Sequence, residues 1–182
     1  SDLLIIVVCK NPNNVFSNCI RSLRQFYNSK ILVVDSDSNK NLEVYKDISE
    51  KYENVEIDMV QNKNWEYGAY KYGFEKYPNY KMYLCFQEGI LIRKKIKLRE
   101  NNIYLIPLIS GWIEFKQGKE IGFNLIKETK LFDYYQKRYR TRFIVCAHNS
   151  FIVDNKTIRE LFNTLTFPPS NKLEEMVYER LF

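Results

Sequence analysis

Two uninterrupted apolar runs constrain the fold more than any other feature of this sequence. They are LLIIVVC at Leu3–Cys9 and KILVVD at Lys30–Asp35. Runs without polar alternation are typical of strands that are covered on both faces, as in a parallel sheet. Between them, apolar residues recur at helical spacing from Val15 to Phe26. The opening is therefore a strand, a helix and a second strand, which is the repeating unit of an α/β fold.

The same alternation continues to residue 86. We expect a second helix over Leu42–Tyr52, a weaker strand over Val55–Val60, a helix over Trp65–Tyr77 that Pro78 ends, and a fourth strand over Tyr80–Phe86. Short connections with right-handed crossovers predict a mostly parallel central sheet with helices on both faces. Ligands of such sheets bind beyond the carboxyl ends of the strands.

The second half departs from this alternation. Strands are predicted at 102–109, 111–115 and 143–153, and helices at 125–135, after Asp154 and after Asn171. Asn171 and Glu174 have the spacing of a capping box. The last helix reaches Phe182 without a stop signal, so we expect a single domain over 1–182 that is truncated at its C-terminus.

Composition narrows the class of protein. The chain has 182 residues, and its longest apolar run is seven residues, whereas a membrane span needs about 20. No basic segment precedes that run, as it would in a secretory signal. The four cysteines form no C-x-x-C pair and have apolar neighbours, which indicates buried free thiols. We therefore expect a cytoplasmic protein without a membrane span.

Charge is distributed unevenly. Residues 92–182 carry 17 basic and 10 acidic residues, and the excess lies mainly in Arg93–Arg99 and Lys137–Arg142. Such clusters suit an anionic partner, whether phosphate, nucleic acid or a membrane surface, or they form a solvated basic face. The glycine-rich motifs of dinucleotide-binding and P-loop proteins are absent, and so is the G-x-S-x-G motif of hydrolases.

Polar residues follow the predicted strands and have two interpretations each. Asp35 and Asp37 suit a nucleobase or ribose contact, or a turn. Gln87-Glu88-Gly89 suits a hard cation that holds a diphosphate, or a hairpin turn. His148, the only histidine, is either a structural residue or a ligand. Glu174 is either a helix-capping residue or a residue with a direct role in the function.

Several of these segments together resemble glycosyltransferases of the GT-A fold, especially small family-2-like enzymes of large DNA viruses, phages and bacteria. The resemblance is carried by the opening strand–helix–strand unit and by ILVVDSDS, NWEYGAYKYGFEKYP, YLCFQEGILI and PPSNKLEEMVYER. It implies transfer of a hexosyl or deoxyhexosyl group from a UDP- or GDP-sugar to a glycan, glycoprotein or other hydroxyl acceptor. Residues 1–92 would bind the donor and residues 93–182 the acceptor.

The resemblance also implies roles for individual residues. Donor contacts would come from Lys10, Asn11, Pro12, Asp35, Asp37, Asn64, Gly68, Lys71 and Gln87. Mn²⁺ or Mg²⁺ would bind at Glu88, with His148 as a second ligand. The family's D-x-D element reads Gln87-Glu88-Gly89 here, so one carboxylate remains of two. A carboxylate would deprotonate the acceptor in an inverting reaction, with Glu174 first and Glu175 and Glu114 as rivals.

Two alternatives from other classes remain open. The basic clusters would also serve a non-catalytic nucleic-acid-binding domain, although the resemblance leads us to expect no nucleic-acid partner. A degenerate glycosyltransferase that only binds glycan or protein is the third possibility. Salt dependence of binding separates the first alternative from the transferase, and donor hydrolysis separates the second.

Overall fold

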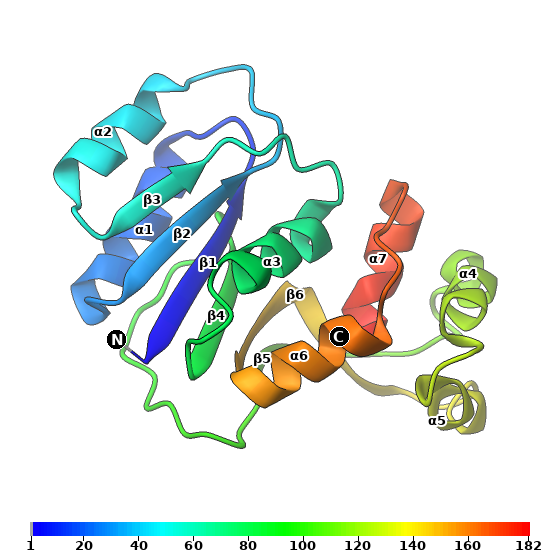
Figure 1. The fold of residues 1–182 in the computed structure, drawn as a ribbon. Coiled ribbons are helices and arrows are strands. Elements are labelled where there is room, and N and C mark those ends of the chain that lie inside the picture. Colours follow the sequence, from blue (N-terminus) through cyan, green and yellow to red (C-terminus); the bar gives the residue numbers. More distant parts are fainter. Residues whose placement is uncertain (1) are drawn as a thin grey trace.

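The computed structural model describes residues 2–182 (Figure 1). Its elements in chain order are β1 (Leu3–Cys9), α1 (Asn14–Phe26), β2 (Lys30–Asp35), α2 (Glu43–Lys51), β3 (Val55–Asp58), α3 (Trp65–Lys76), β4 (Met82–Gln87), β5 (Tyr104–Ser110), α4 (Lys116–Ile126), α5 (Leu131–Lys137), β6 (Phe143–Asp154), α6 (Asn155–Thr164) and α7 (Lys172–Leu181).

The strands form one mixed sheet in the order β3-β2-β1-β4-β6-β5. β1 pairs in parallel with β2 and β4, and β2 pairs in parallel with β3. β6 lies antiparallel between β4 and β5, so one sheet joins the two halves of the chain. The prediction of an α/β fold is confirmed, and every residue of β1 is buried, as its unbroken apolar run indicated.

Helices cover both faces of this sheet (Figure 1). On one face, α1 turns Phe16, Cys19, Ile20 and Leu23 inward, and α2 packs beside it. The side chain of Asn13 caps α1 by accepting from the Val15 N–H at 2.7 Å. The other face is covered by α3, α6 and α7. The amphipathic spacing of the first two helices therefore maps directly onto sheet contact.

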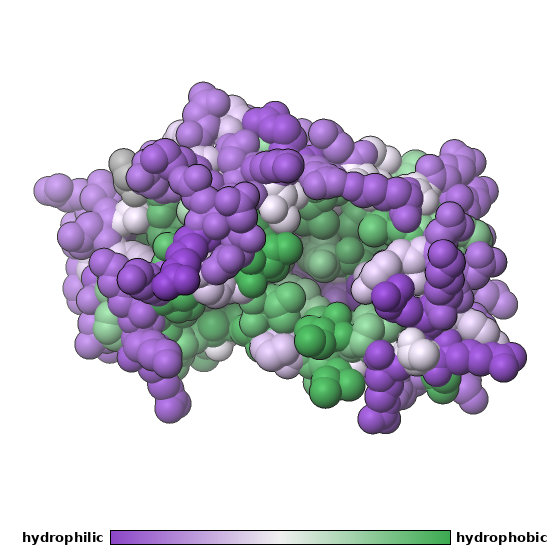
Figure 2. Space-filling model, turned by 90° about the horizontal axis from the view of Figure 1, so that it is seen from below, coloured by the Kyte–Doolittle hydropathy of each residue, from purple (hydrophilic) through white to green (hydrophobic). Residues whose placement is uncertain are grey.

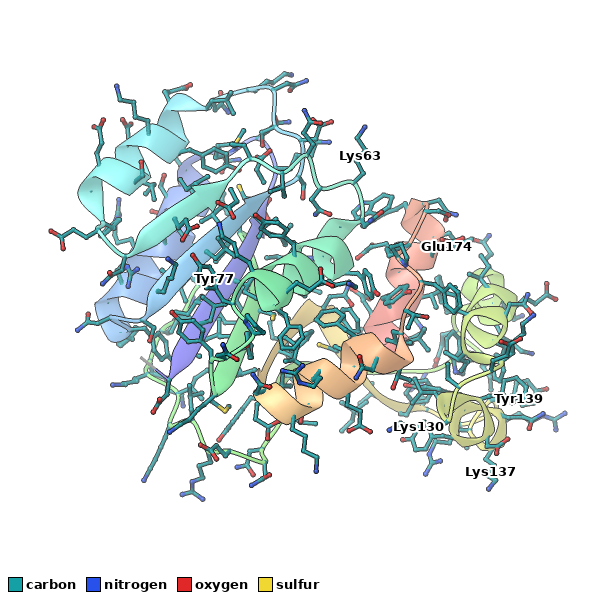
Figure 3. The ribbon with its side chains drawn as sticks, viewed as in Figure 1. Lys63, Tyr77, Lys130, Lys137, Tyr139 and Glu174 are labelled. Atoms are coloured by element: carbon teal, nitrogen blue, oxygen red, sulfur yellow. The ribbon has the colours of Figure 1, made fainter. Side chains whose placement is uncertain are left out.

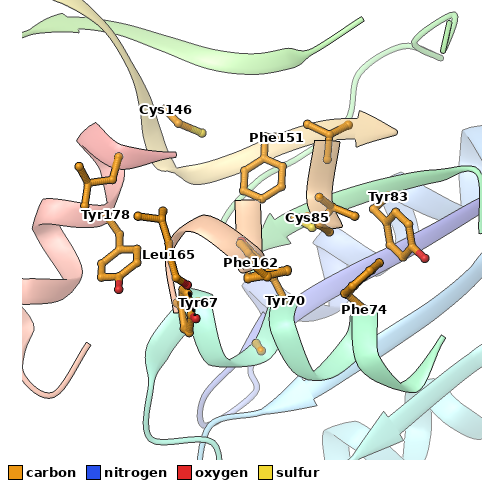
Figure 4. Close-up of a cluster of buried hydrophobic side chains, with 14 of the residues drawn as sticks. Tyr67, Tyr70, Phe74, Tyr83, Cys85, Cys146, Phe151, Phe162, Leu165 and Tyr178 are labelled. Carbon is orange, nitrogen blue, oxygen red and sulfur yellow. Dashed lines mark hydrogen bonds between the residues drawn. The ribbon is translucent and has the colours of Figure 1, made fainter. Parts of the chain in front are cut away.

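The core under α3 is largely aromatic (Figure 4). The Tyr67 ring packs edge-on to Phe162, with ring centroids 5.5 Å apart, and its hydroxyl donates to the Leu165 carbonyl at 2.5 Å. Tyr70 packs edge-on to Phe151 on β6. The aromatic spacing of the 65–77 segment thus ties α3 to α6, α7 and β6.

Two predictions in the second half are wrong. Residues 111–115 are a turn rather than a strand, with Trp112 fully buried and Ile113 exposed. The helix predicted over 125–135 is two helices, α4 and α5, and α4 begins much earlier. Glycine has a low helix propensity, so the sequence of α4 did not predict a helix. A Cβ at Gly122 would lie 2.4 Å from the Trp112 ring, so the close contact with this ring requires glycine. Close packing on that ring therefore outweighs propensity.

Two sequence expectations are tested by the described residues. Cys9, Cys19, Cys85 and Cys146 are all buried and free, as their apolar neighbours indicated. Within residues 2–182, no helix is long and apolar enough to cross a membrane.

Candidate functional site

The sheet has a topological switch point between β1 and β4. From β1 the chain crosses over α1 to β2 and over α2 to β3, on one face, and then returns over α3, on the other face, to β4. The strand order therefore reverses between β1 and β4, and ligands of open α/β sheets bind in a crevice beyond the carboxyl ends of the strands at such a point. Lys10 follows β1 at this point and Gln87 ends β4. Lys10 and Gln87, two of the predicted donor residues, therefore lie at the switch point.

The segments that follow β1 and β2 are hydrogen-bonded to each other. The Asn11 N–H donates to Ser38 Oγ at 2.6 Å, and Asn11 Oδ1 accepts from the Asn39 and Lys40 N–H groups at 3.0 and 3.2 Å. Asn11 has φ 53°, a left-handed conformation that asparagine tolerates. These bonds bring the segment after β1 against the segment after β2, and the nucleobase contact implied for Lys10, Asn11 and Pro12 stays a prediction.

Asp35 is buried and its carboxylate is already occupied. Oδ1 accepts from the Tyr45 hydroxyl at 2.7 Å and from Ser38 Oγ, and Oδ2 accepts from the Ser38 N–H at 2.8 Å. These bonds build the turn, which is the simpler of the two interpretations of this residue. Asp37 is exposed at φ 62° and makes the more accessible carboxylate of the pair.

Asn62 fixes the loop that leads into α3. Its Nδ2 donates to Ser36 Oγ at 3.1 Å and to the Trp65 carbonyl at 2.7 Å, and its Oδ1 accepts from the Asn64 N–H at 3.1 Å. A Cβ on Gly68 would lie 2.2 Å from Asn62 Oδ1, so only glycine fits at position 68 without displacing the loop. Asn62 was not singled out in the sequence.

Three predicted donor residues line one cavity beside this loop. Its volume is about 620 Å³, and Asn64, Gly68 and Lys71 contribute to its wall with Tyr67 and Tyr72. Lys63 and Lys71 supply positive charge, and Lys71 also forms an ion pair with Glu75. Lys63 lies on the loop before α3, across from the start of α7 (Figure 3). The volume is in the range of small-ligand pockets.

A pair of buried carboxyl groups lies next to the carboxyl end of β4. Glu66 on the first turn of α3 and Glu175 on α7 are 8% and 4% exposed. Gln87 Nε2 donates to Glu66 Oε1. Asn149 Nδ2 donates to Glu175 Oε1 at 2.8 Å, and Lys172 Nζ donates to Glu175 Oε2 at 2.6 Å. The site therefore joins α3, β4, β6 and α7 through polar side chains.

The surroundings of Glu66 strongly raise the pKa of its carboxyl group. Burial, together with the negative charge of the neighbouring Glu175 carboxyl, raises the pKa of Glu66 to about 8. Lys172 forms an ion pair with Glu175 and has no such contact with Glu66. Glu66 Oε2 is buried without a hydrogen-bond partner among the described residues, which a shared proton or a bound hydroxyl would supply.

A bulge in β6 brings Asn149 to this site. Between the pairs Leu105–Phe151 and Pro107–Cys146, the pairing advances two residues along β5 but five along β6. Both His148 and Asn149 have left-handed φ values, 55° and 46°. The His148 N–H donates to Glu179 Oε1 at 3.0 Å, which anchors the bulge to α7. The pairing of β4 with β6 stops at Cys85–Phe151, so the bulge lies beyond β4, beside Gln87.

Glu88 lies on the other face of the sheet from Gln87. Burial raises its pKa, while the N–H groups of Glu88 and Lys10 lower it, and its charge acts on Cys9 and Cys19 under α1. The His148 side chain is exposed. Across residues 2–182, no three His, Cys, Asp or Glu side chains converge as a metal site. The metal site at Glu88 and His148 stays a prediction, and we derive no chemical step through it.

The other two predicted acids have ordinary surface partners. Glu174 Oε2 accepts from the Ser170 N–H at 2.6 Å and from Ser170 Oγ at 2.7 Å, and these bonds lower its pKa. Asn171 Oδ1 accepts from the Glu174 N–H at 3.0 Å and so caps α7. Glu114 is exposed and pairs with Arg142 at 2.5 Å. Of the three predicted catalytic acids, only Glu175 belongs to the buried pair.

Sequence reasoning missed Glu66. It precedes Tyr70 by four residues and therefore shares the stripe of α3 that faces the sheet. An acid on a buried stripe is unusual, and that was the available signal. No protein-family model matches this chain, and a search of curated proteins finds no significant relative.

Proposed function

We propose that this chain is a glycosyltransferase that uses a nucleoside-diphosphate sugar as donor. The observation that carries the proposal is the buried pair of Glu66 and Glu175 at the switch point of the sheet. Buried acids with a raised pKa in a crevice of this kind are typical of proton-transfer sites. The sheet order and the polar strand ends also agree with the sequence resemblance to the GT-A fold.

On the donor side, the proposal uses the cavity beside α3. Lys63 and Lys71 would attract the diphosphate, and Asn64 and Gly68 would let it approach the start of α3. Helix N-termini favour anions because their first N–H groups have no partner within the helix. The turn of Asn11 and Ser38 would border the nucleobase, with backbone groups and Asp37 as the free contacts.

On the acceptor side, Glu66 replaces Glu174 as the first candidate for the general base. The efficiency of a base is highest when its pKa lies near the working pH, and Glu66 meets this condition better than a surface carboxylate. Glu175 would act through Glu66, because its charge keeps the Glu66 pKa high. Gln87 and Asn149 would hold the two carboxyl groups in place.

The proposed step is a single displacement. In the molecules in which Glu66 is ionised, the acceptor O–H gives its proton to the Glu66 carboxylate, and the oxygen forms a bond to the anomeric carbon. The bond from that carbon to the diphosphate breaks, and the electron pair leaves on the diphosphate oxygen. Lysine side chains stabilise the leaving charge. Attack opposite to the leaving group inverts the configuration.

A ligand panel tests the proposal. Melting temperatures are measured with nucleoside diphosphates and nucleotide sugars, since ligand at 100 times its Kd stabilises the native state by about 2.7 kcal/mol. Release of UDP or GDP from the stabilising donor is then measured, with and without simple glycan acceptors. Stabilisation by a nucleotide sugar followed by nucleotide release supports the proposal. The absence of both contradicts it.

The same panel distinguishes the two alternatives. If the chain is a degenerate glycosyltransferase that only binds ligands, donors would stabilise it and no nucleotide would be released. A nucleic-acid-binding domain would bind oligonucleotides with an affinity that falls steeply as salt rises. Either result would replace the transferase proposal.

A further inference from the structure

An apolar groove runs along the lower side of the molecule as drawn in Figure 1. Figure 2 views this side and shows a hydrophobic centre between hydrophilic ends. The groove lies between β5, β6 and α6, and its wall includes Ile103, Leu105, Cys146, Phe151 and Phe182. We call this face, together with Ile109 and Ile144, the lower surface.

The lower surface carries the most exposed apolar side chains of the described residues. Ile109, Ile144 and Ile103 are 68%, 64% and 60% exposed. Ile109 and Ile144 are directly paired across β5 and β6, so they point to the same side of the sheet. Ile144 and Cys146 also share a side, because side chains alternate along a strand. The isoleucine pair thus continues the groove toward α5.

Basic residues lie at both ends of the lower surface. At one end, the Arg93–Arg99 segment follows β4 and runs near the N-terminus, where Lys95 and Lys97 are both exposed. At the other end, residues 116–142 carry eight basic and three acidic residues. Lys130, Lys137 and Tyr139 lie at the lower right of the molecule in Figure 3. The two charge clusters of the sequence therefore flank one apolar face.

Few of these cations are neutralised. Arg142 pairs with Glu114, and Lys130 pairs with Glu160. Lys137 forms no ion pair within residues 2–182. Arg138 and Arg140 lie against the rings of Tyr134 and Tyr139, at 3.9 and 5.3 Å. Aromatic rings beside cations and exposed aliphatic side chains are the combination found on surfaces that enter a lipid headgroup layer.

We propose that the lower surface docks on a membrane that contains anionic lipids. The charge is complementary to lipid phosphates and carboxylates, and the apolar centre gains by leaving water. A nucleic acid would use the cations but would leave the isoleucine pair in water. The proposal goes beyond the transfer reaction and rests on different residues, because neither Glu66 and Glu175 nor the residues of the cavity beside α3 line the groove.

Vesicle sedimentation tests the proposal. The protein is mixed with vesicles of phosphatidylcholine alone and of phosphatidylcholine with 30% phosphatidylserine, at about 0.1 M salt. We expect binding to the mixed vesicles, little binding to the neutral ones, and loss of binding at about 0.5 M salt because the charges are screened. Equal binding to both vesicle types, or no binding to either, overturns the proposal.

Matched variants locate the contact. Ile109→Ser with Ile144→Ser should weaken vesicle binding at least tenfold, whereas Met59→Ser, an exposed apolar residue after β3, should not. Lys137→Gln with Arg140→Gln should weaken it by about five-fold per charge. Lys46→Gln with Lys51→Gln on α2 is the charge control. All four variants change exposed side chains, and melting temperatures verify that they remain folded.

Two further measurements distinguish a membrane from other possible partners of the lower surface. If Ile109→Ser with Ile144→Ser instead abolishes a concentration-dependent dimer seen by ultracentrifugation, the surface joins two copies and the membrane proposal is wrong. If oligonucleotides compete fully with vesicles and the isoleucine variant binds both as well as wild type, only the charges matter and the proposal is also wrong. Nucleotide binding should be unchanged in every variant.

Discussion

Glu66 on α3 and Glu175 on α7 hold their carboxyl groups together at the end of β4, although 108 positions separate them along the chain. Each carboxyl group has its own amide partner, Gln87 for Glu66 and Asn149 for Glu175. Burial of two acids side by side opposes ionisation of both, so the pair keeps a proton at a pH where a surface acid has lost it.

The first prediction concerns stability against pH. The pKa of Glu66 is raised in the folded state, so its favourable contribution is present at low pH and is lost as pH rises through about 8. We expect the free energy of unfolding to fall between about pH 5 and 8, by about 1.4 kcal/mol for each pKa unit of the shift. Glu66→Gln should flatten this dependence, and Glu120→Gln on the surface of α4 should not. Urea unfolding at several pH values measures it, and parallel curves for wild type and Glu66→Gln would refute the assignment.

The second prediction concerns the acid that takes the proton. Glu66→Gln should lower the transfer rate by about 10²–10⁴, the usual effect of losing a general base. Glu174→Gln should retain a rate near wild type, because Gln still accepts from Ser170. Rates are measured at saturating donor. If Glu174→Gln loses activity while Glu66→Gln keeps it, the base is the cap residue after all.

The third prediction concerns the loop before α3. Gly68→Ala would place a Cβ 2.2 Å from Asn62 Oδ1, so we expect a loss of about 1–3 kcal/mol of stability and weaker binding of nucleoside diphosphate. Gly89→Ala is the matched control, since nothing lies within 4 Å of its added Cβ. Thermal unfolding and calorimetry measure the two effects. Identical behaviour of the two variants would mean that the loop is free to move.

The fourth prediction concerns divalent metal. One carboxylate holds a hard cation weakly, so a bound diphosphate must supply further oxygen ligands. We expect Mn²⁺ to strengthen the binding of UDP or GDP relative to a chelator, and Glu88→Gln to remove the difference. Calorimetry with nucleotide alone measures it independently of transfer. If wild type binds nucleotide equally in Mn²⁺ and in chelator, lysines alone hold the diphosphate.

The first half of the fold followed from sequence because burial on both faces leaves an unbroken apolar run. Val7 and Val33 are neighbours in the sheet and lie in two such runs. The second half was harder, since α4 depends on the contact between Gly122 and Trp112, and no local pattern encodes that contact.

The candidate site divides in the same way. Asn11 and Asp35 could be placed together because parallel strands end at one edge of a sheet. Glu66 could not, because its environment is created by Glu175 and by the β6 bulge at Asn149, both far along the chain. A residue whose chemistry comes from distant partners has only its buried position as a local signal.

The insertion of β6 between β4 and β5 has a consequence for synthesis of the protein. Fifty-five residues separate Gln87, the end of β4, from Phe143, the start of β6. At about 5–20 residues per second, a ribosome needs roughly 3–11 s to bridge that interval. During this time the apolar β4 strand, MYLCFQ, has an open edge. A chaperone that binds extended apolar segments would find its target in this window, and slower translation across residues 88–142 would lengthen the exposure.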